Sequence, residues 1–121
     1  RYARVFQVYG PNERKNRLIP SLFSALKKGK VFYVNQPNSV RDFISVDDVV
    51  IKILEMTKFK KKKTIETWHI GNGKPLKIKD FVLNLLKKKF KKNKIKKVKF
   101  KKNVTNYENH VSIIKNLWVK K

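Results

Sequence analysis

Side chains that could transfer protons, act as nucleophiles or bind metals are few in this sequence, and their spacing matches no catalytic centre. None of the four tyrosines is followed four residues later by a lysine, so a Tyr-x-x-x-Lys proton-transfer pair is absent. There is no cysteine, and His69 and His110 lie too far apart for the ligand spacing of a zinc site. Most acidic residues fall at expected helix starts, where capping explains them. We therefore predict neither a catalytic nor a metal-binding residue.

The glycines also lack the pattern of a cofactor site. The chain has Gly10, Gly29, Gly71 and Gly73, and no spacing among them forms the G-x-G-x-x-G loop that cradles a dinucleotide pyrophosphate. The sequence accordingly predicts no cofactor-binding residue.

Charge is the strongest compositional signal. The chain has 32 Lys+Arg against 8 Asp+Glu, a formal net charge of +24, which by itself indicates a nucleic acid or another anionic partner. Only five of the 32 are arginines, however, and base or phosphate recognition usually depends on the planar guanidinium. The lysines concentrate in 58–63 and 87–102. Solvated lysine-rich faces account for this pattern, and a nucleic-acid-binding module is the alternative.

The hydrophobic pattern predicts a single α/β domain or a piece of one. Strands are expected at 3–9, 31–34, 41–44, 64–70 and 94–100, the last as a lysine-guarded edge strand. Helices are expected at 17–28, from Ser45, from near Leu76 and at 110–118. Ser45 is the expected N-cap of its helix, with Asp48 bonding back and the run at 60–63 fraying its end.

The apolar stripes of these helices are the expected core. They comprise Leu18, Ile19, Leu22, Phe23 and Leu26 in the first helix, Val46, Val49, Val50, Ile53 and Leu54 in the second, and Ile78, Phe81, Val82, Leu85 and Leu86 in the third. No apolar run approaches the roughly 20 residues of a bilayer span, and residues 1–15 lack a signal-peptide core. We expect a cytoplasmic protein.

Four short blocks stand in a particular order: Arg4–Pro11 (RVFQVYGP), Arg17–Pro20 (RLIP), Arg41–Val49 (RDFISVDDV) and Trp68–Lys74 (WHIGNGK). Here the sequence resembles the extended short-chain dehydrogenase/reductase family of NAD-dependent nucleotide-sugar epimerases and dehydratases. The family's R-x-x-N-V-Y-G-P, L-I-P, R-D-F-[IV]-x-V-D-D-V and N-I-G-x-G blocks match in the same order. Each block alone is a weak signal, but four in register are strong. The resemblance covers roughly residues 3–86 well.

The resemblance implies an α/β fold: the C-terminal, substrate-binding portion of an extended Rossmann-type enzyme, without the dinucleotide-binding part. Residues 1–16 would end the Rossmann-type domain with a late strand and its following loop. Residues 17–121 would form the small α/β domain that closes over the nucleotide sugar.

Five substrate-binding residues follow from the resemblance. Arg41 would contact the substrate diphosphate, which suits a guanidinium held on a short strand; the alternative is a surface arginine paired with Asp42 or Asp47. Gln7 replaces the family's asparagine in the first block and keeps the amide. Leu18 and Ile19 lie where the family wraps the nucleotide, and Val34 lies where it places a residue against the base.

The sequence also departs from the family pattern. The asparagine expected before Ile70-Gly71 is His69, and Thr105 stands where the family has a second diphosphate arginine before an acidic residue, here Glu108. The closing G-W-x-P segment is reduced to Leu117–Lys120. These changes predict a degenerate tail, or substitution of the missing arginine by Lys101 or Lys102.

Together these features predict the nucleotide-sugar-binding part of an NAD- or NADP-dependent epimerase or dehydratase. The chain alone is expected to be inactive and to bind no cofactor. Its expected partners are a nucleotide sugar and an upstream Rossmann domain, on the same or a separate chain, with a homodimer for the intact enzyme and no membrane. The sugar, the base and the reaction type stay open.

Overall fold

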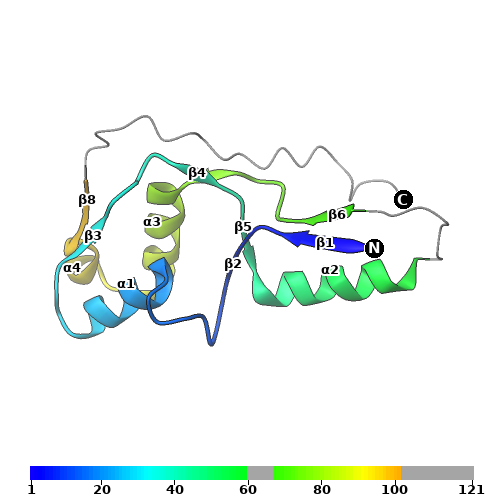
Figure 1. Cartoon of the computed structure of the whole chain (residues 1–121). Helices are drawn as coiled ribbons and strands as arrows, with labels where there is room; N and C mark the ends of the chain where they lie inside the picture. Colours follow the sequence, from blue (N-terminus) through cyan, green and yellow to red (C-terminus); the bar gives the residue numbers. More distant parts are fainter. Residues whose placement is uncertain (60–66, 102–121) are drawn as a thin grey trace. The chain divides into compact units, whose positions relative to one another are not determined.

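The computed structural model describes residues 1–59 and 67–101, and Figure 1 shows their helices and strands. In chain order these are β1 (Tyr2–Val5), β2 (Gln7–Tyr9), α1 (Leu18–Lys27), β3 (Phe32–Val34), β4 (Val40–Arg41), β5 (Phe43–Ser45), α2 (Val46–Lys58), β6 (Thr67–Ile70), β7 (Leu76–Lys77), α3 (Ile78–Lys89), α4 (Lys92–Ile95) and β8 (Val98–Phe100). They divide into two compact units. Unit 1 holds Arg1–Pro11 and the described part of Asp42–Pro75, and unit 2 holds Asn12–Arg41 and residues 76–101.

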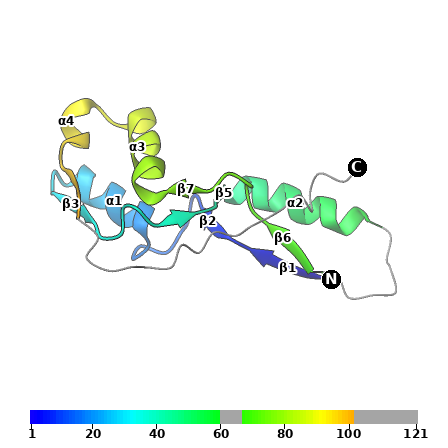
Figure 2. The same ribbon diagram turned by 90° about the horizontal axis from the view of Figure 1, so that it is seen from above.

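Unit 1 is built on two parallel strand pairs. β1 pairs with β6, with Val5 opposite Ile70, and β2 pairs with β5. The two strands of the first pair run side by side in Figures 1 and 2. The predicted strand at 3–9 is confirmed with a break at Phe6, whose N–H donates to the Ile70 carbonyl at 3.0 Å. Its partners come from far along the chain, which the sequence pattern did not indicate.

Helix α2 begins where it was predicted to begin. The Ser45 hydroxyl oxygen accepts a hydrogen bond from the Asp48 N–H at 3.1 Å, which confirms Ser45 as the N-cap. Asp48 bonds back as well, since its carboxylate accepts the Ser45 hydroxyl proton at 2.7 Å. Gly10, which follows β2, lies against Val46, the first residue of this helix. A Cβ at position 10 would lie 2.6 Å from Val46 Cγ1, so only glycine allows the two segments to lie this close.

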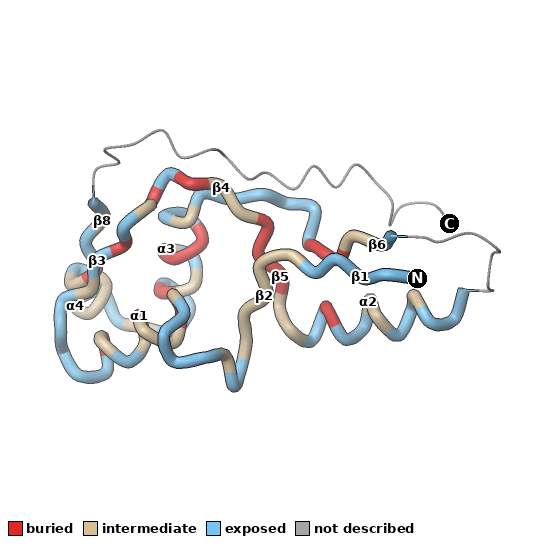
Figure 3. The backbone as a smooth tube through the Cα atoms, viewed as in Figure 1, coloured by how far each residue is buried: buried red, intermediate tan, exposed pale blue. Residues whose placement is uncertain are grey.

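The predicted stripe of α2 is only half correct. Val49 is buried with Ile44 and Ile70, and Ile53 packs against them, but Val50 and Leu54 are 49% and 55% exposed. Strands β2, β5 and β6 contact one side of the helix, so the outer part of the stripe faces away from the core. In Figure 3, α2 is coloured mostly intermediate and exposed, with a buried segment in its first half.

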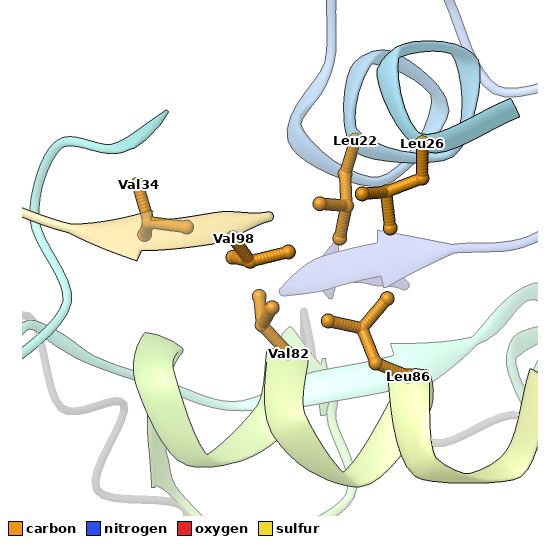
Figure 4. Packing of buried hydrophobic residues seen from close by; sticks show 6 residues of the cluster. All are labelled: Leu22, Leu26, Val34, Val82, Leu86 and Val98. Atoms are coloured by element: carbon orange, nitrogen blue, oxygen red, sulfur yellow. The ribbon is translucent and has the colours of Figure 1, made fainter. Parts of the chain in front are cut away.

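Unit 2 has a closed core. Parallel strands β3 and β8 and helices α1 and α3 supply its buried residues, and antiparallel strands β4 and β7 form a separate pair in the same unit. The buried cluster consists of Leu22, Leu26, Val34, Val82, Leu86 and Val98. In Figure 4 the leucines of α1 and the α3 residues Val82 and Leu86 point toward one another. The predicted stripes of α1 and α3 are thus confirmed at their central positions.

One predicted boundary in unit 2 was wrong. Residues 94–95 belong to the short helix α4, so the strand expected at 94–100 begins only at Val98. The helix expected to start near Leu76 begins at Ile78, because Leu76 pairs with Arg41 and Lys77 with Val40 in a two-residue strand. The frayed run at 60–63 and the helix at 110–118 lie outside the described residues. No described helix has both the length and the hydropathy of a membrane span.

Candidate functional site

Arg41, the predicted diphosphate ligand, lies on β4 in unit 2. Its backbone pairs with Leu76 of β7, and its side chain is half-buried. One guanidinium nitrogen, Nη1, donates to the carbonyl of Val40 at 2.7 Å. Within the described residues it forms no ion pair with Asp42 or Asp47, so its remaining donors are not committed to a carboxylate.

Asp42 has a different role from the one considered in the sequence. It is 3% exposed, and its two carboxylate oxygens accept the backbone N–H groups of Asn72 at 2.9 Å and Gly73 at 3.0 Å. Charge-assisted bonds of this kind are stronger than neutral ones. The carboxylate therefore holds the loop after β6 at the start of β5, a function that sequence reasoning missed. The sequence did contain a signal for this role, namely an acidic residue, Asp42, directly before an apolar strand, together with a Gly-Asn-Gly loop later in the chain.

The three apolar site residues belong to unit 2. Leu18 packs against the core cluster, Ile19 is 9% exposed, and Val34 is 1% exposed inside the cluster. The side chain of Val34 thus faces the core. Because side chains alternate along a strand, the preceding residue, Tyr33, faces outward and is 56% exposed.

Gln7 belongs to unit 1, where β2 places it opposite Phe43. Its N–H donates to the Asp42 carbonyl at 3.2 Å, and its side chain is half-buried. His69, which replaces the family's asparagine, lies on β6 with its ring edge-on to Phe6, 5.8 Å between centroids. Among residues 1–59 and 67–101 no three potential metal ligands cluster.

A pocket of about 520 Å³ lies beside α1 in unit 2 and contains none of the five predicted site residues. Its lining is Lys15, Pro20, Ser21, Ser24, Ala25, Lys28, Lys30 and Phe32. Its three lysines, Lys15, Lys28 and Lys30, are all exposed residues of a lysine-rich chain. The pocket therefore does not define a site.

Several lysines of unit 2 lie over aromatic rings. Lys89 lies 5.1 Å from the ring centroid of Phe23, Lys94 5.9 Å from that of Phe90, and Lys101 6.0 Å from that of Tyr33. Such cation–π contacts stabilise exposed sites by about 0.5–1 kcal/mol each. Packing thus accounts for part of the lysine placement without a nucleic-acid partner.

Comparison with known families decides the class of this chain. The family described as "NAD dependent epimerase/dehydratase family" matches residues 1–71. The chain belongs to this family. A curated member, CDP-abequose synthase of Salmonella typhimurium (strain LT2), is 34% identical over 84 residues, covering 68% of this chain and 28% of the synthase.

Solved members of the family have the same fold over this region. An NAD-dependent NDP-hexosamine 5,6-dehydratase, TunA, involved in tunicamycin biosynthesis, is 26% identical with a TM-score of 0.66, covering 88% of this chain and 33% of its own. UDP-glucuronic acid 4-epimerase from Bacillus cereus, solved with UDP-glucuronic acid and NAD, is 25% identical with a TM-score of 0.64 over 84% of this chain and 32% of its own. The α/β class with parallel strands is confirmed, and the chain spans about a third of these relatives.

Proposed function

We propose that this chain is the nucleotide-sugar-binding part of an NAD-dependent epimerase or dehydratase, and that Arg41 binds the substrate diphosphate. The observation that carries the proposal is the position of Arg41 in the third of four ordered family blocks, on a strand that the structure fixes by pairing with Leu76. The match to the family over residues 1–71 supports it.

The geometry of Arg41 suits a diphosphate. A guanidinium has five N–H donors, and the described contacts of Arg41 use Nη1 for the Val40 carbonyl. The other donors can form the bidentate bonds that make arginine a better phosphate ligand than lysine. Half-burial on β4 limits the rotamers of the side chain, so less entropy is lost on binding.

A nucleotide base that lies along β3 would meet Tyr33 first. This ring is 56% exposed, whereas the Val34 side chain is packed in the core. Leu18 at the start of α1 is partly exposed and supplies apolar surface. We assign the base contact to Tyr33 and an apolar contact to Leu18, while Ile19 and Val34, which are 9% and 1% exposed, would support them from the core; Gln7 is proposed to contact the sugar or a phosphate.

NAD chemistry is assigned to a Rossmann-type part outside these 121 residues, on the same chain or a separate one. The B. cereus epimerase binds NAD, and this sequence contains neither the glycine-rich loop nor Tyr-x-x-x-Lys. The half-exposed apolar residues Val50, Ile51 and Leu54 of α2 support this, since an apolar helix face of that kind usually packs on another element.

Calorimetric titration tests the proposal. UDP-, dTDP- and CDP-sugars are each titrated into the chain, with NAD in a parallel titration. We expect saturable heats for at least one nucleotide sugar and none for NAD. Micromolar NAD binding would show that the cofactor site is misplaced. Affinity for a polynucleotide that falls steeply with salt, without affinity for any nucleotide sugar, would favour the nucleic-acid alternative.

A further inference from the structure

The loop held by Asp42 contains an asparagine followed by a glycine, Asn72-Gly73. Both residues are exposed, and no heavy atom lies within 4 Å of the position a Cβ on Gly73 would occupy. The described residues offer no hydrogen-bond partner to the Asn72 side-chain amide. A glycine in the second position leaves the backbone nitrogen unobstructed, so this nitrogen can attack the asparagine side-chain carbonyl. The loop thus has the chemical requirements for cyclisation.

Asp42 engages the attacking nitrogen. The Gly73 N–H donates to Oδ2 of Asp42 at 3.0 Å, and the neighbouring Asn72 N–H donates to Oδ1 at 2.9 Å. The amide nitrogen attacks only after it loses its proton, and a carboxylate that accepts this proton's hydrogen bond stabilises the protonated form. The two bonds also fix the peptide plane between Asn72 and Gly73, and Gly73 has a φ of 73°. The folded loop is therefore restrained both chemically and geometrically.

We propose that Asn72 is a site of spontaneous deamidation whose rate is set by the buried carboxylate of Asp42. In the reaction, Gly73 N forms a bond to Cγ of Asn72, the Cγ–Nδ2 bond breaks, and ammonia leaves with the proton. Water then opens the five-membered succinimide to aspartate or isoaspartate. The net change is one water taken up and one ammonia released, so no oxidant, enzyme or cofactor is needed.

The products act back on the same contact. Either product adds a carboxylate to the loop that Asp42 holds, and like charges at short range repel. Isoaspartate also inserts one backbone carbon between residues 72 and 73, so both N–H groups can no longer reach Asp42 together. Each modified chain thereby loses the contact between the loop and β5, and modified chains accumulate with age.

Mass spectrometry of the whole chain tests the proposal without any variant. Trypsin releases a peptide spanning residues 64–77, because Lys74 precedes proline and is not cleaved, and Asn72 is the only asparagine in it. The rate of conversion at Asn72 is measured at one pH in buffer and in denaturing urea. We expect the folded chain to convert at least about tenfold more slowly, the rate factor that corresponds to ~1.4 kcal/mol. Equal rates in the two conditions would overturn the proposal.

Asp42→Asn with Asp47→Asn as its matched control tests the role of the carboxylate. Asparagine at 42 places an amide NH₂ or a neutral oxygen where Oδ2 accepts from Gly73, whereas Asp47 is an exposed residue in the first turn of α2. In buffer, Asp42→Asn should convert about tenfold or more faster than the wild type, and Asp47→Asn at the wild-type rate. A folded Asp42→Asn chain with the wild-type rate would overturn the assignment to Asp42. If this variant does not fold, the urea comparison on the wild type decides.

Discussion

The two units of this chain differ in how completely they bury their own apolar residues. In unit 2, Leu22, Leu26, Val82 and Leu86 are all fully buried between two helices and two strands. Among the described residues of unit 1, Ile44, Val49 and Ile70 form a small buried cluster, Phe43 is also buried, and all four residues of β1 are exposed. In the described residues, unit 2 thus buries more of its apolar side chains than unit 1, which leaves Val50 and Leu54 of α2 half-exposed.

The same difference separates the kinds of function assigned to the two units. The closed core of unit 2 includes Val34 of β3, which leaves Tyr33 exposed, while the half-buried Arg41 lies on β4, which pairs with β7. In unit 1 the most specific interaction is polar, the Asp42 contact with the loop at 72–73. A closed apolar core and a loop held by one carboxylate should therefore respond differently to substitution.

The largest expected effect is the loss of a leucine from the closed core. Leu86→Ala should lower the free energy of unfolding by about 2–5 kcal/mol, because it removes fully buried methyl groups and leaves a cavity. Leu54→Ala is the matched control in α2. Leu54 is 55% exposed, so this substitution should lower the free energy of unfolding by less than about 1 kcal/mol. Urea denaturation measures both. Equal losses would show that the two units are not packed differently.

The next largest effect is expected at Asp42. Asp42→Asn should lower the free energy of unfolding by about 1.5–3 kcal/mol, because a charge-assisted bond to a buried carboxylate is lost and an N–H is left without its acceptor. Hydrogen exchange at the amides of Asn72 and Gly73 should accelerate more than exchange in α1. Unchanged protection of these two amides would contradict the account of the loop.

A smaller effect is expected at the N-cap of α2. Ser45→Ala removes the acceptor for the Asp48 N–H and should destabilise the chain by ~1 kcal/mol. Ser24→Ala is the control, since Ser24 lies inside α1 and alanine is a better helix former there. Thermal melts of the two variants should shift in opposite directions or differ by several degrees. A Ser45→Ala melt equal to that of the wild type would show that the Ser45 cap does not stabilise α2.

The smallest effect on stability is expected on the outer face of α2. Leu54→Gln should change the free energy of unfolding by no more than about 0.5 kcal/mol, but it should reduce binding of a hydrophobic dye. Lys52→Gln, on the same helix, should leave dye binding unchanged. A wild-type chain that melts as a compact, cooperative monomer without binding the dye would contradict the idea that this face packs on another part of an enzyme.

Much of the local structure could be predicted because it follows from short-range physics. The spacing of Leu22 and Leu26, the glycine stop at Gly29 and the cap at Ser45 each act within a few residues, and the structure confirms them. Long-range features were less accessible. The exposure of Val50 and Leu54 depends on which strands cover α2, and the two-residue strand at Leu76 forms only because Arg41 lies opposite it.

The candidate site, too, could be predicted from the sequence only in part. Its residues came from a family resemblance that the comparisons confirm at the level of the family, while the roles of Arg41, Gln7, Leu18, Ile19 and Val34 stay predictions. Strand alternation, a local rule, could have indicated that Tyr33 and not Val34 faces outward. The role of Asp42 could not be derived locally, since its partners lie 30 and 31 residues away in the chain.

The proposal that Arg41 binds the substrate diphosphate is tested most directly by the nucleotide-sugar affinity of the Arg41→Lys variant. The affinity is measured in a protein that joins this chain to a Rossmann-type part. Lysine keeps the charge but loses the bidentate fork of the guanidinium. The free energy of nucleotide-sugar binding should therefore become less favourable by about 1–3 kcal/mol, while the free energy of unfolding stays unchanged. Arg14→Lys is the matched control, because Arg14 is exposed and has no described side-chain hydrogen bond. We predict weaker binding for Arg41→Lys alone. Equal affinity of wild type, Arg41→Lys and Arg14→Lys for every nucleotide sugar tested would contradict the assignment of Arg41 to the diphosphate.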